Sequence, residues 1–64
     1  MRINGKTVLL QHEMTLAELL LLQRFNCRAV AVEVNGTIVP RTEYDSVRLV
    51  NEDTLEIVQF VGGG

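Results

Sequence analysis

The chain has 64 residues, of which 47% are hydrophobic and 22% are charged, and its formal net charge is −2. A chain this short buries only roughly 60% of its unfolded surface, so we expect one domain with one modest core and little room for a buried active site with a lid. Six scattered lysine and arginine residues argue against a nucleic-acid binder, which gains affinity by massing basic side chains against phosphates.

The sequence also indicates where the protein works. A single cysteine, Cys27, cannot form an internal disulfide, which favours a reducing compartment. The longest leucine run, Leu19 to Leu22, is far too short to span a membrane. Residues 1–10 do not resemble a signal peptide. We therefore expect a cytoplasmic protein with neither a membrane nor a nucleic acid as partner.

The first third of the chain predicts a hairpin followed by a helix. Asn4-Gly5 tolerates positive φ at both central positions of a tight turn, so residues 1–10 are expected to form two short antiparallel strands. Thr15 and Glu18 have the spacing of a capping box, which starts a helix. This helix is expected to run to about Phe25, with Asn26 as its left-handed stop.

The rest of the chain predicts strands. Residues 30–34 alternate at period two, Asn35-Gly36 is a second tight turn, and residues 37–39 return until Pro40, which cannot donate to a strand ladder. A polar segment over residues 41–50 is expected to include a short helical turn, and its expected core anchors are Tyr44, Val47 and Leu49. Residues 54–61 form the longest expected strand.

This order of elements predicts an α+β fold. One helix can cover only one face of a sheet, so we expect two layers, with a mixed sheet of four to five strands. If the first and last strands lie side by side they run parallel, with a hairpin on either flank, which is the β-grasp (ubiquitin-like) arrangement. Residues 1–61 are the expected domain and residues 62–64 a flexible tail.

The tail, Gly62-Gly63-Gly64, directly follows the last expected strand. Three glycines lose much entropy when ordered, so the tail is expected to be mobile. Fully extended they span about 10 Å, and without any Cβ they fit a channel too narrow for other residues. Terminal glycines are also common as a frayed end, and that reading stays open at this point.

The ordered set of motifs resembles the ThiS family of sulfur carriers in thiamine (thiazole) biosynthesis. It comprises Val34-Asn35-Gly36, Ile38-Val39-Pro40-Arg41, Tyr44, Asp53, Leu55-Glu56-Ile57-Val58 and Phe60-Val61-Gly62-Gly63-Gly64. The resemblance covers nearly the whole chain. Glu52 departs from it, because the family often has glycine before the aspartate.

The resemblance implies that the chain is not an enzyme but a protein co-substrate. An E1-like adenylyltransferase of the ThiF type would use MgATP to adenylate the carboxylate of Gly64, with Gly62 and Gly63 threading into the partner's active site. Sulfur from cysteine, supplied by a cysteine desulfurase or another donor, would then form a thiocarboxylate. Thiazole synthase of the ThiG type would take this sulfur. The chain itself would bind no cofactor.

Alternation along the last strand predicts a docking face. Leu55 and Ile57 are expected to face the helix, which leaves Glu56, Val58 and Phe60 on the opposite face of the sheet. Exposed apolar clusters commonly mark partner sites. The competing interpretation is that Phe60 folds back onto the edge of the core.

Other polar residues predict no site. His12 has no second ligand nearby in sequence, so we expect no metal site. We interpret Cys27 as a small, partly buried apolar residue. The acidic residues 43, 45, 52, 53 and 56 are interpreted as a solvated face, and Leu21 and Leu22 either pack as ordinary helix residues or mark a second contact surface.

Three other functions compete with the thiazole pathway. The small subunit of molybdopterin synthase, of the MoaD type, shares the β-grasp fold, the double-glycine end and the thiocarboxylate chemistry. A non-catalytic β-grasp interaction module would make the tail incidental. Conjugation to lysine, as in ubiquitin, would give products of higher mass. Short length and residues 35–41 favour the thiazole pathway.

Overall fold

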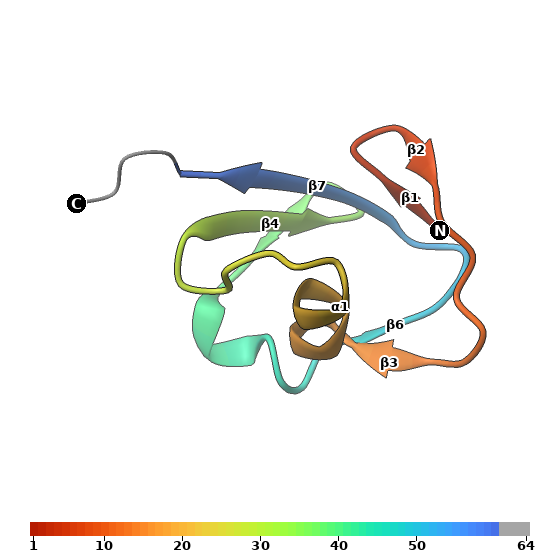
Figure 1. Cartoon of the computed structure of the whole chain (residues 1–64), viewed down its shortest axis with the longest axis horizontal. Coiled ribbons are helices and arrows are strands. Elements are labelled where there is room, and N and C mark those ends of the chain that lie inside the picture. Colours follow the sequence, from red (N-terminus) through yellow and green to blue (C-terminus); the bar gives the residue numbers. More distant parts are fainter. Residues whose placement is uncertain (61–64) are drawn as a thin grey trace.

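The computed structural model describes residues 1–60. The fold is built on a five-stranded mixed sheet (Figure 1). Its strand order is β2-β1-β7-β4-β5. The central pair, β1 and β7, is parallel, with Arg2 opposite Thr54, and the other pairs are antiparallel. The strands are β1 (Arg2–Ile3), β2 (Lys6–Thr7), β4 (Val30–Val34), β5 (Thr37–Val39) and β7 (Thr54–Gln59). This confirms the α+β, β-grasp prediction.

Two hairpins flank the central pair, and both have the expected turns. Asn4 and Gly5 have φ of 51° and 83°, and Asn35 and Gly36 have φ of 52° and 85°. Positive φ at both central positions defines a type I′ turn, whose twist matches that of the flanking strands. The two Asn-Gly pairs therefore determined both hairpins locally.

The helix α1 (Leu16–Leu22) begins at the predicted capping box. The Thr15 hydroxyl accepts from the Glu18 backbone N–H at 3.1 Å, and the Glu18 carboxylate accepts from the Thr15 N–H at 2.7 Å. The bond from the Thr15 N–H, followed by the bond with the Thr15 hydroxyl, lowers the pKa of Glu18. The helix packs on one face of the sheet with three buried leucines: Leu16, Leu19 and Leu20.

The end of the helix differs from the prediction. The helix stops at Leu22, and the left-handed residue is Arg24, with φ of 64°, instead of Asn26. The Arg24 N–H donates to Leu21 O at 3.1 Å and the Phe25 N–H to Leu20 O at 2.8 Å. These two bonds form a Schellman motif. In this motif the residues at the positions of Leu20 and Phe25 commonly make a hydrophobic contact. Phe25 packs against the core, so tertiary contact determined where the chain turns.

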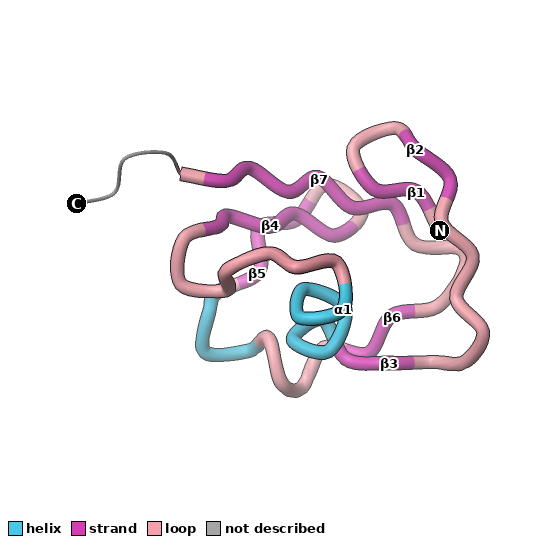
Figure 2. The backbone as a smooth tube through the Cα atoms, viewed as in Figure 1, coloured by secondary structure: helices cyan, strands magenta, loops and turns pink. Residues whose placement is uncertain are grey.

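A second, two-stranded sheet was not predicted. β3 (Met14–Thr15) pairs with β6 (Arg48–Leu49), to the right of α1 in the tube view of Figure 2. A 3₁₀ helix, Arg41–Glu43, supplies the expected helical turn before β6. Tyr44 and Leu49 are buried and Val47 is partly buried, which confirms these three as core anchors.

The core lies between α1, the inner face of the sheet and the segment from Tyr44 to Leu49. Its fully buried members come from α1, β4, β6 and β7. Burial of each large apolar side chain contributes about 2 kcal/mol to the free energy of unfolding. They are Leu16, Leu19, Leu20, Val32, Leu49 and Leu55. The opposite face of the sheet carries no helix in the described part of the chain (Figure 1). No helix within residues 1–60 has the length and hydrophobicity to cross a membrane.

Candidate functional site

The strand β7 carries the chain to the predicted tail and is paired with β4 from Leu55 to its end. The pairing runs from Val34 opposite Leu55 to Val30 opposite Gln59, and the Phe60 N–H donates to Ala29 O at 2.7 Å. Regular structure in β7 ends at Gln59. The predicted strand end at Val61 and the tail residues, Gly62 to Gly64, lie outside the described residues.

A side chain holds the other edge of β7, where β1 is too short to reach. The Asn4 side-chain oxygen accepts from the Ile57 N–H at 2.7 Å, and its amide donates to Ile57 O at 3.0 Å. The Asn4 amide thus pairs with β7 as a further strand residue would. Sequence reasoning assigned Asn4 only to the turn and missed this role, since nothing local signals a partner 53 positions away.

The three residues predicted for the docking face lie together on the side of β7 turned away from α1. Glu56, Val58 and Phe60 are exposed, and Val58 and Phe60 keep 59% and 55% of their surface accessible. Phe60 therefore does not fold back onto the core. On the neighbouring strand Ala31 lies opposite Val58 and Glu33 opposite Glu56. The predicted exposure is confirmed, and their role in docking remains a prediction.

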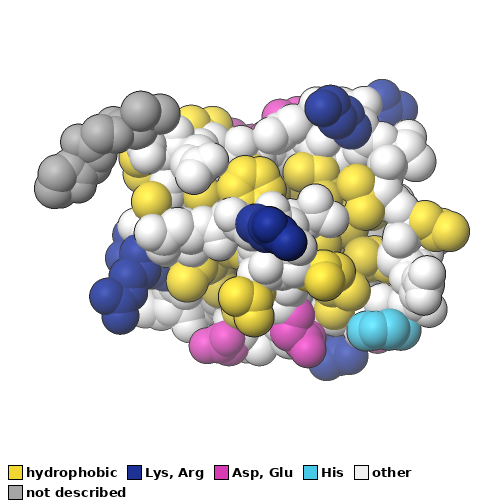
Figure 3. Space-filling view, in the orientation of Figure 1, with side chains coloured by type: hydrophobic (Ala, Val, Ile, Leu, Met, Phe, Trp, Pro, Cys, Tyr) yellow, Lys and Arg dark blue, Asp and Glu magenta, His cyan; other side chains and the backbone are white. Residues whose placement is uncertain are grey.

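A second apolar surface lies over the helix. Leu21 is 80% exposed, and Leu9 and Leu22 are also exposed, so Leu21 and Leu22 do not pack as ordinary core residues. Hydrophobic side chains gather on this face of the molecule (Figure 3). A groove of about 220 Å³ runs beside them, and its lining includes Leu9, Leu22 and Met14.

The remaining polar candidates do not converge. His12 is exposed, with its Nδ1 2.9 Å from Glu13 O, and residues 1–60 contain no group of three potential metal ligands. Cys27 is exposed, so our expectation of partial burial was wrong. It lies in the segment between α1 and β4.

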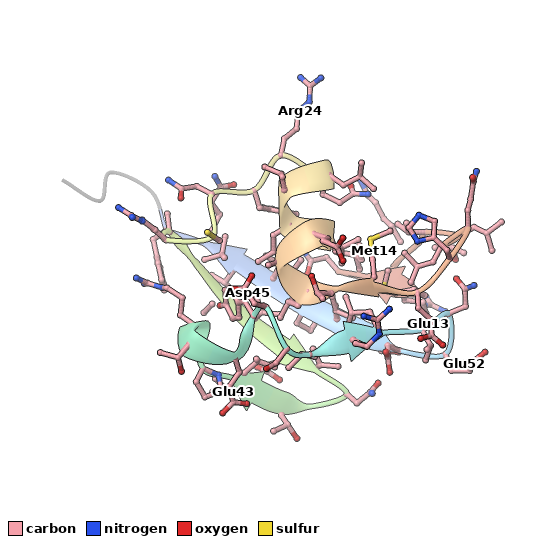
Figure 4. The ribbon with its side chains drawn as sticks, turned by 90° about the horizontal axis from the view of Figure 1, so that it is seen from below. Glu13, Met14, Arg24, Glu43, Asp45 and Glu52 are labelled. Atoms are coloured by element: carbon pink, nitrogen blue, oxygen red, sulfur yellow. The ribbon has the colours of Figure 1, made fainter. Side chains whose placement is uncertain are left out.

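The acidic residues are spread along the molecule. Figure 4 shows Glu43 and Asp45 at one end of the molecule and Glu52 beside Glu13 at the other. Asp53 has a structural role instead: it accepts from the Val50 N–H at 2.9 Å and from the Asn35 amide at 2.9 Å. The other four acidic residues are exposed, as expected of solvated side chains, and Asp53 is half-buried.

Comparison with known proteins places this geometry in one class, the small β-grasp carriers. The model of the ThiS family matches residues 1–64. The sulfur carrier protein ThiS of Bacillus subtilis is 37% identical over 65 residues, covering 100% of this chain and 98% of that protein. The crystal structure of the thiamine biosynthesis protein ThiS from Geobacter metallireducens superposes with a TM-score of 0.80 at 30% identity, covering 98% of this chain and 96% of that chain.

The chain therefore belongs to the ThiS family, as its motifs predicted. A relative of another kind is the thiazole synthase of Paramagnetospirillum magneticum, 44% identical over 62 residues. The match covers 97% of this chain but only 19% of that protein. A unit of this kind is thus one part of a longer thiazole synthase chain.

Proposed function

We propose that this chain is a sulfur carrier of thiamine biosynthesis that works in the cytoplasm and holds sulfur on the carboxylate of Gly64. The observation that supports this most is the match to the ThiS family over residues 1–64, which includes the three glycines that follow β7. An activity of its own is not needed, since the chemistry is done by the enzymes that act on the tail.

The proposed reaction begins with a carboxylate, which is a poor acyl donor because oxide would have to leave. In an E1-like adenylyltransferase the Gly64 carboxylate attacks the α-phosphorus of MgATP, and pyrophosphate leaves. A persulfide, formed from cysteine by a desulfurase or another donor, then attacks the acyl carbon and displaces AMP, which gives an acyl disulfide. A thiol then attacks the disulfide on its distal sulfur, forms a new disulfide with the donor and releases the acyl sulfur. The product is a thiocarboxylate. MgATP belongs to the activating enzyme, and this chain holds no cofactor.

The fold supports this role by presenting the tail from a fixed strand. β7 is paired with β4 on one edge and with the Asn4 side chain on the other, so the last described residues have a defined direction. Gly62 and Gly63 then thread into the partner's active site. Val58, Phe60 and Glu56, which lie on the exposed face just before the tail, form the surface on which the partner docks.

The proposed acceptor of the sulfur is thiazole synthase. Support comes from the relative in which a matching unit is part of a thiazole synthase chain. Fusing a carrier to its acceptor raises the effective concentration of the carrier's tail at the acceptor's active site. Such a fusion therefore favours an acceptor role for thiazole synthase. A ThiF-type adenylyltransferase is the proposed activating partner.

The test is the intact mass of the protein, purified without reductant or alkylating agent from cells that contain its own pathway. A species heavier by the difference between sulfur and oxygen, localised to the peptide ending at Gly64, is expected. Deleting Gly63 and Gly64 should abolish this species and all sulfur transfer. A carboxylate that stays unmodified after incubation with MgATP, a cysteine desulfurase and the activating enzyme would contradict the proposal.

A further inference from the structure

One hydrogen bond holds the chain at the point where β7 leads into the tail. The Phe60 N–H donates to Ala29 O at 2.7 Å, one step beyond the ladder pair of Val30 and Gln59. Ala29 precedes the first residue of β4, so the strand ladder does not itself hold it. The direction of the chain at Phe60 therefore depends on what fixes the segment before β4.

Side chains from the segment after β5 hold the two carbonyls on either side of this one. The Arg41 guanidinium donates to Arg28 O at 3.1 Å, and the Tyr44 hydroxyl donates to Val30 O at 3.4 Å. The 3₁₀ helix that begins at Arg41 lies at the same end of the molecule as the start of β4 and the end of β7 (Figure 1). Each carbonyl of residues 28–30 thus accepts a bond, the outer two from side chains.

Arg41 is itself connected to the core through Tyr44. The Tyr44 N–H donates to Arg41 O at 3.1 Å, and Tyr44 O accepts from the Ala17 N–H of α1 at 2.9 Å. Tyr44 is buried, and burial raises its pKa while the positive charge of Arg41 acts in the opposite direction, as expected of a guanidinium near the hydroxyl. A path of hydrogen bonds therefore runs from α1 through Tyr44 and Arg41 to the segment that bonds Phe60.

The direction of the chain at Phe60 matters because the tail is short. Three extended glycines span about 10 Å, so a swing of about 10° at their base moves their far end by about 2 Å. A misplacement of about 1 Å at a reacting group can lower a rate about 100-fold. When the exposed face of the sheet is docked, the direction at Phe60 decides where the carboxylate arrives.

We propose that Arg41 is a positioning residue for the adenylation of Gly64, because its bond to Arg28 O sets the direction in which the tail leaves β7. This inference rests on the proposed carrier function. Arg41 acts through the segment of residues 28–30 and supplies no reacting group. Its loss should slow adenylation of the docked tail and leave the affinity of the docking face unchanged.

The experiment measures kcat and KM for adenylation of the full chain by a ThiF-type adenylyltransferase from the same organism, with pyrophosphate release as the readout. Arg41→Ala should lower kcat about ten-fold and leave the KM for the carrier within about two-fold of wild type. Arg41→Lys, whose ammonium can still donate to Arg28 O, should recover most of kcat. Arg48→Ala is the matched control and should react as wild type, since this exposed arginine pairs with Glu13 at 3.6 Å instead.

Amide hydrogen exchange followed by NMR tests whether the effect passes through the proposed segment. In Arg41→Ala the Phe60 N–H should exchange several-fold faster, because the segment that carries its acceptor has lost a restraint. The Ile57 N–H, which donates to the Asn4 side chain, should exchange as in wild type. The melting temperature should stay close to that of wild type, since Arg41 is exposed.

Three results would overturn this inference while the carrier function stands. They are an unchanged kcat for Arg41→Ala, a raised KM with unchanged kcat, which would make Arg41 a docking residue, and exchange of the Phe60 N–H at the wild-type rate. Failure of the carrier function would appear differently, as a wild-type chain that the activating enzyme never adenylates.

Discussion

Replacing Asn4 by glycine tests whether a single side chain holds the edge of the strand that leads to the tail. Glycine tolerates the φ of 51° at this position, so the turn is retained and only the two bonds to Ile57, at 2.7 Å and 3.0 Å, are lost. At about 1 kcal/mol for each bond, Asn4→Gly should lower the free energy of unfolding by about 2 kcal/mol. Asn4→Ala should cost about 1 kcal/mol more, since alanine is strained at positive φ.

This loss is large for so small a domain. A chain of this length is expected to have a stability of about 3–10 kcal/mol, and the melting temperature should fall by roughly 8–16 °C. Urea unfolding followed by far-UV circular dichroism measures the change. Gln11→Gly, at an exposed loop residue, controls for the added freedom of glycine in the unfolded chain. If Asn4→Gly and Gln11→Gly were equally stable, the side-chain bonds to Ile57 would not support the strand.

Four further predictions concern the helix ends, the core and the docking face. Arg24→Gly should raise the free energy of unfolding by about 1 kcal/mol in urea titrations, because glycine relieves the strain at φ of 64°; an unchanged midpoint would contradict this. Phe60→Asp should weaken adenylation while thermal unfolding stays the same, and full adenylation would exclude Phe60 from the docking face. Because the pKa of Glu18 is lowered in the folded protein, its contribution to stability is complete above the ordinary glutamate pKa of about 4.3. This contribution is lost as the pH falls through the lowered pKa. Acid unfolding of Glu18→Gln compared with wild type measures it. Burial raises the pKa of Tyr44, so its contribution to stability is complete below the ordinary tyrosine pKa of about 10 and is lost as the pH rises through the raised pKa. In alkaline unfolding, the stability of Tyr44→Phe should therefore fall less with pH than that of wild type.

Features that depend on neighbouring residues were determined by the sequence alone. Both Asn-Gly turns require positive φ at two adjacent positions, which few other dipeptides tolerate. The capping box between Thr15 and Glu18 satisfies orphaned N–H groups within one helical turn. Alternation along β4 and β7 separates a buried face from an exposed one, so the exposure of Val58 and Phe60 was also predictable.

The tertiary structure decided the features that depend on contacts between residues far apart in the chain. The strands β3 and β6 have two residues each, too few for any periodicity, and exist because Met14 meets Leu49. Arg24 took the left-handed position because the next residue, Phe25, packs against the core. The opposition of Glu33 and Glu56 follows from strand register, which a shift of one residue would abolish. Local energies fixed the turns and caps of this chain, whereas the packing of its core fixed which side chains face one another.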